Sequence, residues 1–322
     1  MFFKEAGQVS TSKMAQSDES PPKILIERIR INSTLLTVVL AIISVVTTTG
    51  NLLVIWTIYR NPRWEQRTVS KLLVVNLAVA DLMVGLLGEP LLIISHLVLK
   101  NSHNELANNF TTAAGLVLIL TMAASSCTIY NLTLERYLSL EMPPWREKLF
   151  TGLPGKLSIC CIWSFALLIA FLPTLIGKVD MIKLFHSGFF VFVAIVVIGL
   201  YMRMFIIIRK FNKTPLTQRI NQPLVQPGHV YTAAKRREHS YVKDMFLFVG
   251  VYVVCYLPFC IASFNSYSSI SIVAEKTGLI LLAFLNSALN PVLYTFTMPR
   301  HRRKVKKILD GLIRALRLSL CR

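Results

Sequence analysis

The segment LLTVVLAIISVVTTTGNLLVIWTIY, residues 35–59, contains no charged side chain. An apolar run of about 20 residues is long enough for a helix to cross the hydrocarbon core of a bilayer. Strands of a membrane barrel are about 10 residues long and alternate apolar with polar residues. This segment is longer and does not alternate. It therefore predicts a transmembrane helix.

Six further apolar segments of similar length follow in the chain. They lie at 70–98, 108–140, 155–176, 183–211, 238–265 and 271–297. The whole chain of 322 residues is 54% hydrophobic and 16% charged, whereas a soluble chain is about 25% charged. We expect an all-α integral membrane protein, with a seven-transmembrane helix bundle over 35–297.

The charge distribution predicts the orientation of this bundle. Lys and Arg outnumber Asp and Glu by 35 to 16, for a net charge of +19. The segments after spans 1, 3, 5 and 7 carry four, four, nine and nine basic residues, and the other three loops carry one, two and one. Basic loops stay in the cytoplasm. The sequence thus predicts a multi-pass plasma-membrane protein with an extracellular N-terminus, and the basic excess does not indicate nucleic-acid binding.

The two ends of the chain lie outside the predicted bundle. Residues 1–34 are polar, and we expect a disordered extracellular tail. Asn32 is a glycosylation acceptor, and Asn109 is a weaker one because it lies close to the membrane. In residues 298–322, apolar positions recur every three or four residues between basic ones. This pattern predicts a short amphipathic cytoplasmic helix on the membrane lipids, and Cys321 beyond it is either palmitoylated or a free thiol.

Polar residues inside the membrane are the strongest functional signal. A carboxylate at the centre of a span costs about 2.5–3.5 kcal/mol, so Asp81 in the second span needs a partner. Asn286, Asn290 and Tyr294 are spaced by four and share one face of the last span. Pro291 in that span permits a kink. No phosphate loop, catalytic nucleophile, paired carboxylates or zinc-like spacing is present, so we do not expect an enzyme or a cofactor.

Motifs on six of the seven spans resemble those of the rhodopsin-like (class A) G-protein-coupled receptors. They are Gly50-Asn51, Leu77-Ala78-Val79-Ala80-Asp81, Glu135-Arg136-Tyr137, Trp163, Cys255-Tyr256-Leu257-Pro258 and Asn290-Pro291-Val292-Leu293-Tyr294. The resemblance implies a receptor that converts extracellular ligand binding into activation of a heterotrimeric G protein through movement of the sixth helix. A seven-helix transporter or channel is the alternative, but it would need a polar path or inverted repeats, and neither is visible.

Departures from the family pattern narrow the resemblance. Thr111 stands where most members have a disulfide-forming cysteine, the second outer loop is very short, and span 5 has no proline. These features are similar to melanocortin receptors, with adenosine, cannabinoid and lysophospholipid receptors as the wider group. Leu91, Thr111 and Gly115 replace the acidic cluster that binds melanocortin peptides, which speaks against such a peptide as ligand.

The resemblance also implies three sets of site residues. The G-protein coupling and switch set is Glu135, Arg136, Tyr137, Tyr201, Glu238, Asn290, Pro291 and Tyr294, with an ion pair between Arg136 and Glu238. A sodium site would comprise Asp81, Ser125, Asn286, Ser287 and Asn290, and a water-filled cluster without an ion is the alternative. The ligand pocket would be lined by Leu118, Ile119, Met122, Phe185, His186, Phe189, Tyr256, Phe259, Ser263, Ile280 and Phe284.

The pocket set predicts the character of the ligand. Leu118 stands where amine receptors place an aspartate, and Phe284 stands where opsins place the retinal lysine. The walls are aromatic and aliphatic, with Glu89, His96 and His186 as the polar candidates. This composition favours an apolar, lipid-like or small peptide ligand over a biogenic amine, although each residue alone fits ordinary helix packing. Ser319 is the one hydroxyl residue beyond residue 300, so we expect weak arrestin binding through the tail.

Overall fold

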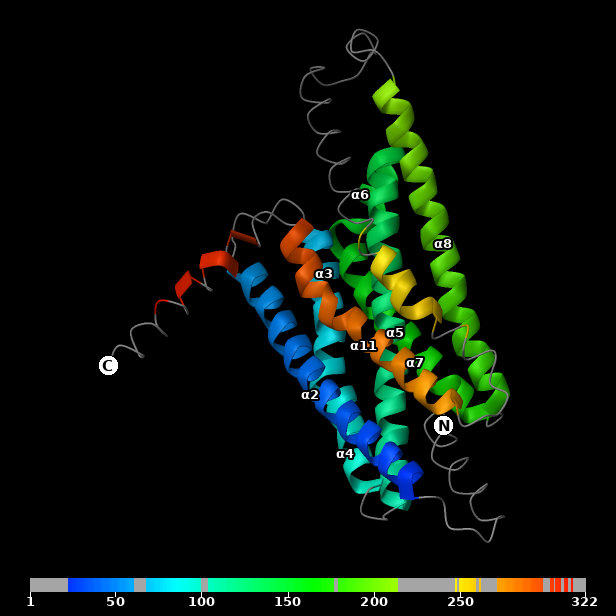
Figure 1. Cartoon of the computed structure of the whole chain (residues 1–322). Helices are drawn as coiled ribbons and strands as arrows, with labels where there is room; N and C mark the ends of the chain where they lie inside the picture. The colour runs from blue at the N-terminus through cyan, green and yellow to red at the C-terminus, as the bar shows by residue number, and fades with distance from the viewer. Residues whose placement is uncertain are drawn as a thin grey trace, which may run out of the picture.

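The computed structural model is a bundle of long helices (Figure 1). It describes residues 23–60, 68–99, 104–176, 179–213, 249–258 and 271–297, residues 247 and 261, and eight positions between 302 and 314. Nearly all of these residues are helical, and no strand occurs among them. The all-α fold class is therefore confirmed.

The helices follow the order of the predicted spans. They are α2 (Lys23–Tyr59), α3 (Thr68–Met83), the π-helical turn η2 (Val84–Gly88), α4 (Glu89–Leu99), α5 (Asn104–Glu141), α6 (Pro143–Phe150), α7 (Gly152–Ile176), α8 (Val179–Lys213), an unlabelled helix over 249–258, and α11 (Ser271–Thr297). The rod of α3, η2 and α4 forms the second span.

Five of the described helices are apolar and long enough to cross a membrane. They cover Thr34–Tyr59, Lys71–Val98, Glu105–Glu141, Gly152–Leu172 and Leu184–Lys210. Two shorter apolar helices, Val249–Pro258 and Leu281–Thr295, lie within the predicted sixth and seventh spans. The described positions of the tail are helical as well, and all but the half-buried Val305 are exposed.

The structure corrects the sequence analysis at two places. Helix α2 begins at Lys23, so the predicted disorder is wrong for residues 23–34. No Gly or Pro occurs between Lys23 and Thr49, and an uninterrupted helix extends cheaply once it has started. The second correction is α6, which was not predicted and begins with Pro143 and Pro144, residues that suit a first helical turn.

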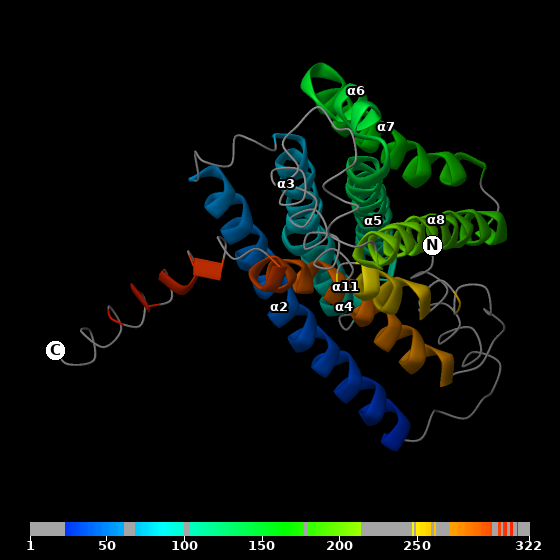
Figure 2. The ribbon, with the colours of Figure 1, turned by 90° about the horizontal axis from the view of Figure 1, so that it is seen from above.

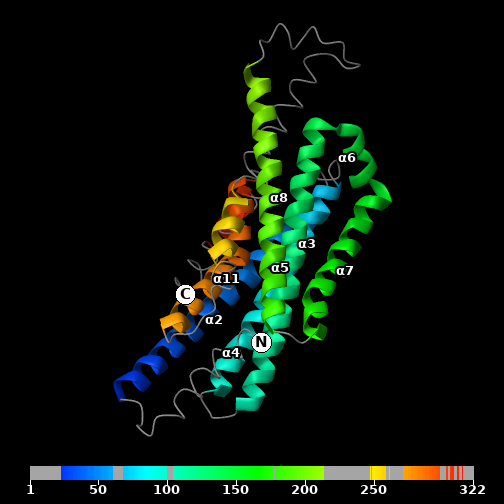
Figure 3. The same ribbon diagram turned by 90° about the vertical axis from the view of Figure 1, so that its right-hand side faces the viewer.

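Helix α5 is the central element of the bundle (Figure 2). It contacts α3, α4, α6, α7 and α8, while α2 packs against α3, η2, α4 and α11. The short α6 joins α5 to α7 at the predicted inner end (Figure 3). The apolar core follows α5 through the bundle, and many apolar side chains on the outer faces of the other helices are exposed, as a lipid-facing surface requires.

A proline explains the π-helical turn in the second span. The N–H of Glu89 bonds the carbonyl of Val84, five residues back, and the next residue, Pro90, has no N–H. The wider turn relieves the clash that a proline ring makes with the preceding helical turn. The carbonyl of Gly85 then accepts a hydrogen bond from Ser44 Oγ of α2 at 2.7 Å. Helix α2 thus satisfies a backbone group that the turn leaves open.

The proline in α11 has the same consequence. Pro291 cannot donate to the carbonyl of Ser287, four residues back. Asn51 Nδ2 of α2 donates to that carbonyl at 3.2 Å. Gly50 permits the approach, because a Cβ atom at this position would lie 2.8 Å from Cγ of Pro291. Helix α2 therefore binds a backbone carbonyl in the second span and another in the last span.

We predict that Ser44→Ala destabilises the protein. It leaves the buried carbonyl of Gly85 without a partner, and an unsatisfied buried acceptor costs about 1–3 kcal/mol. Thermal unfolding in detergent measures the effect. Thr49→Ala is the matched control, because exposed Thr49 donates to Val45 of its own helix. Equal loss in both variants would refute the role of Ser44.

Candidate functional site

The buried polar cluster around Asp81 is the first part of the site. Asp81 is 0% exposed, and Asn290 Nδ2 donates to its Oδ2 at 2.6 Å. The other oxygen, Oδ1, has no hydrogen-bond partner within the described part of the chain. Ser125, Asn286 and Ser287 are also buried. The structure thus gives Asp81 its predicted partner from α11 and leaves one carboxylate oxygen available.

An aromatic column connects this cluster to α5 and α8. Asn286 Nδ2 donates to the hydroxyl of Tyr256 at 3.3 Å. The Tyr256 ring stacks on Phe190, with centroids 6.1 Å apart, and meets Tyr252 edge-on at 4.9 Å. The hydroxyl of Tyr252 donates to Ser126 Oγ at 3.0 Å. A movement of the helix over 249–258 would therefore disturb polar contacts to both α11 and α5.

Asn76 of α3 hydrogen-bonds to both α5 and the tryptophan of α7. Its Nδ2 donates to Thr128 Oγ1 of α5 at 2.8 Å. Trp163 Nε1 donates to Asn76 Oδ1 at 2.8 Å. One amide therefore joins α3, α5 and α7.

Glu135 at the predicted inner end binds two arginines. It is 0% exposed, and its Oε2 lies 2.9 Å from Arg136 Nη2. Arg146 of α6 places both Nε and Nη2 at 2.9 Å from Oε1. The sequence analysis missed Arg146, because its proximity to Glu135 depends on α6 folding back against α5. Glu238, the predicted partner of Arg136, lies outside the described residues.

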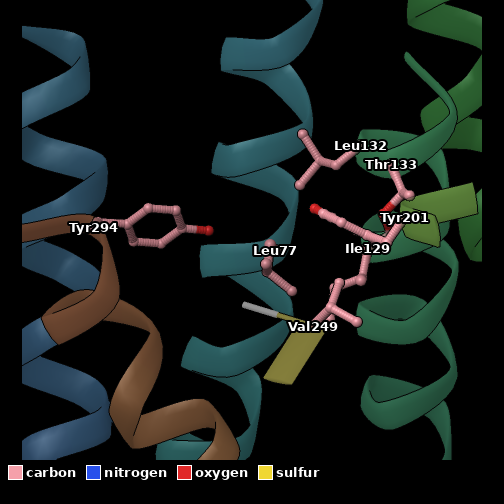
Figure 4. A pocket seen from close by; sticks show the side chains of 7 residues that line it. All are labelled: Leu77, Ile129, Leu132, Thr133, Tyr201, Val249 and Tyr294. Carbon is pink, nitrogen blue, oxygen red and sulfur yellow. The ribbon is translucent and has the colours of Figure 1, made fainter. Parts of the chain in front are cut away.

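Two predicted switch tyrosines line a small cavity next to this ion pair. The cavity has room for about one water molecule. The hydroxyl ends of Tyr201 and Tyr294 point toward each other across it (Figure 4). The residues that line it are Leu77, Ile129, Leu132, Thr133, Tyr201, Val249 and Tyr294. One tyrosine of α8 and one of α11 therefore face the same cavity at the predicted switch.

The predicted pocket residues divide between two apolar clusters. Leu118 and Phe284 pack with Leu40 and Ile43 of α2, which the sequence analysis did not include. Met122 and Tyr256 belong to the main core, and Ile119 and Phe189 pack against it. Phe185 differs from the rest because it is 43% exposed. The side chains of Phe259, Ser263 and Ile280 lie outside the described part.

The three polar pocket candidates differ in their partners. His186 donates Nε2–H to the carbonyl of Ile169 at 2.8 Å. His96 donates Nδ1–H to the carbonyl of Leu92 at 2.8 Å. Both histidines are therefore occupied by backbone groups. Glu89 is 0% exposed, and neither carboxylate oxygen has a hydrogen-bond partner in the described residues.

The structure describes some of the predicted modification sites and not others. Asn109 is exposed on α5. The side chain of Asn32 and all of Cys321 lie outside the description. Thr111, at the place of the missing cysteine, forms a short hydrogen bond with Ser95 of α4. Helices α4 and α5 are therefore joined here without a disulfide, and the four described cysteines are free.

Comparison with known proteins agrees with this geometry. A family model described as "7 transmembrane receptor (rhodopsin family)" matches residues 50–184 and 178–294. The adenosine receptor A2a of Canis lupus familiaris is 27% identical over 308 residues, which covers 85% of this chain and 71% of the relative. The histamine H2 receptor of Homo sapiens is 27% identical over 286 residues, which covers 80% of this chain and 75% of the relative.

The Asp81–Asn290 contact predicts a measurable coupling. Asn290→Ala should lower the free energy of unfolding in sodium-free buffer, and the loss should be smaller when Asp81 is already Asn. We expect a coupling of about 1.5–3 kcal/mol, as for hydrogen bonds to charged groups. Thermal unfolding of the four variants measures it. Asn131→Ala, whose amide bonds Cys127 in its own helix, should show no coupling to Asp81.

Proposed function

The chain belongs to the rhodopsin family of seven-transmembrane G-protein-coupled receptors, and from this premise we propose that an extracellular ligand shifts its helix bundle between a resting and a G-protein-activating state. The protein is a membrane receptor and not an enzyme. The family gives no support to the transporter or channel alternative. A ligand that binds the active state more tightly would raise its population.

The observation that carries the proposal is the arrangement at the inner end. Arg136 is 4% exposed and lies against Glu135, which Arg146 also binds. Next to it, Tyr201 and Tyr294 face one cavity from two helices. Movement of the helix over 249–258, which supplies Val249 to the cavity wall, would open this region to a cytoplasmic partner. We propose that Arg136 then contacts the G protein.

The ligand we propose has a largely apolar body. Leu118, Met122, Tyr256 and Phe284 are buried apolar or aromatic residues of the outer half. The names of two relatives refer to adenosine and histamine, but Leu118 gives this chain no carboxylate at the place where amine receptors have one. A lipid-like molecule or a small apolar peptide fits these walls better than a biogenic amine bound in that manner.

Sodium is the allosteric ion that we propose for the Asp81 cluster. Sodium is a hard cation and prefers oxygen ligands. The open Oδ1 of Asp81 would supply one ligand, and the buried side-chain oxygens of Ser125 on α5 and of Asn286, Ser287 and Asn290 on α11 are the candidates for the others. A water-filled cluster without an ion is the competing state. These residues would hold the ion only while α11 stays against α3.

The remaining proposals concern the two faces of the membrane. We propose an extracellular N-terminus, from the basic inner loops, with glycans on Asn32 and less readily on Asn109. The tail after residue 298 would lie on the inner leaflet, with Cys321 as a candidate for palmitoylation. Because Ser319 is its one hydroxyl residue, arrestin would bind the tail weakly.

The proposed function predicts guanine-nucleotide exchange. Membranes that carry this chain, given a panel of candidate ligands, should accelerate exchange on a purified heterotrimeric G protein compared with matched empty membranes. Arg136→Ala should return exchange to the level of empty membranes at equal surface expression. Arg203→Ala, on the exposed face of α8, is the control that should keep activity. Equal exchange with and without the wild-type chain would contradict the proposal.

The sodium proposal predicts an ion-specific stabilisation. Sodium chloride should raise the unfolding temperature of wild type more than choline chloride at equal ionic strength, because an ion that binds the folded state stabilises it by mass action. Asp81→Asn should abolish the difference. If the variant responds to sodium as strongly as wild type does, the ion binds elsewhere.

A further inference from the structure

Glu89 is a buried carboxyl side chain with no hydrogen-bond partner among the described residues, in the outer half of the bundle. Its side chain is 0% exposed, and both of its oxygens lack a hydrogen-bond partner among the described residues. Asp81 has Asn290, and Glu135 has two arginines. An intramembrane carboxylate without a partner is costly and marks a functional site. Glu89 is therefore a candidate for binding a group from outside the chain.

The surroundings of Glu89 are apolar on three helices. The residues on either side of it in the same rod, Val84 and Leu92, belong to a buried cluster. That cluster also contains Leu40, Ile43, Ala114, Leu118, Phe284 and Ala288, from α2, α5 and α11. Among the residues whose side chains the structure describes, each Lys and Arg lies toward the opposite end of its helix, and His96 of the same rod bonds the carbonyl of Leu92. Glu89 therefore has no basic partner among those side chains.

The residue before Glu89 packs against Leu118 of α5. A Cβ atom on the preceding residue, Gly88, would lie 3.2 Å from Cδ2 of Leu118, so the two helices touch at this point. The π-helical turn that ends at Gly88 changes the phase of the rod by about one residue, and this turn determines which side of α4 faces the bundle. A carboxyl group on the neighbouring helix is thus one residue away from the contact with Leu118.

We propose that Glu89 is the counter-ion for a cationic group on the ligand, with the apolar cluster around Leu118 and Phe284 receiving the rest of the molecule. This proposal rests on the receptor function proposed above and specifies its ligand class. The ligand would be an amphipathic cation: a protonated amine attached to an apolar body, either a small molecule or the amino terminus of a short peptide. The ring of Phe284 adds a surface that attracts cations.

A metal ion is a poorer occupant than an organic cation. Sodium and calcium require several oxygen ligands, and the side chains of the buried cluster that contains Val84 and Leu92 supply none. A protonated amine needs one carboxylate and tolerates apolar walls along its substituents. The composition of the cluster therefore favours the amine.

The test measures binding to the full-length receptor purified in detergent. The probes are phenylalkylammonium salts of increasing chain length and the phenylalkanols of equal length, which lack the charge. A second pair is an apolar tripeptide with a free amino terminus and its N-acetylated form. The concentration dependence of the unfolding temperature gives the affinity of each probe. The two pairs distinguish a small amine from a peptide terminus as the source of the cation.

We expect at least one cationic probe to bind wild type about tenfold or more tightly than its neutral counterpart, as truncation of buried charge pairs generally shows. Glu89→Gln should remove this preference. Glu105→Gln, which neutralises an exposed carboxylate in the first turn of α5, should keep it. The proposal is overturned if no cation binds, if neutral probes bind wild type equally well, or if Glu89→Gln retains the preference.

The stability of the variant without ligand separates binding from folding. Glu89→Gln replaces a buried carboxyl group that has no partner among the described residues with an amide of nearly equal size, so its unfolding temperature should equal or exceed that of wild type. A lower temperature would show that Glu89 has a structural partner, which also overturns the proposal. The binding measurement uses no G protein. Failure here with normal nucleotide exchange by wild type would therefore refute the role of Glu89 alone, and the reverse result would refute the receptor function.

Discussion

The requirement that every backbone polar group find a partner without water shapes this bundle. Pro90 and Pro291 each remove an N–H donor from a membrane helix. The carbonyls that need other partners, those of Gly85 and Ser287, are taken by Ser44 and Asn51 of α2. Because these two residues are seven apart, they lie on one face of α2. The first helix therefore stabilises the two spans whose irregular backbone creates the sites.

Three buried carboxylates show how the bundle distributes charge along its length. At the inner end Glu135 is bound by two arginines, and at the middle Asp81 is bound by one amide. Toward the outer end Glu89 has no hydrogen-bond partner in the described residues. The number of described partners of a buried carboxylate thus decreases from Glu135 through Asp81 to Glu89.

The aromatic column provides a physical route between these levels. Tyr256 contacts Asn286 on one side and Tyr252 on the other, and Tyr252 bonds Ser126 of α5. The sequence analysis predicted Tyr256 and Asn286 but missed Tyr252 and Phe190, since a tyrosine within an apolar span looks like ordinary packing. Arg146 was missed for a related reason. Its partner Glu135 is eleven residues away, across a turn into α6 that hydropathy does not reveal.

The sequence by itself determined the number, order and helical character of the spans, because an apolar run of about 20 residues in a bilayer has few alternatives to a helix. It also identified Asp81, Glu135 and Pro291, because charges and prolines are rare and costly there. The tertiary structure alone decided which of these groups meet and which stay unpaired. The burial of Glu89 depends on the π-helical turn before Pro90, which changes the facing of α4. Residue spacing along the chain cannot show that a buried carboxylate lacks a hydrogen-bond partner, because this depends on how three helices pack together.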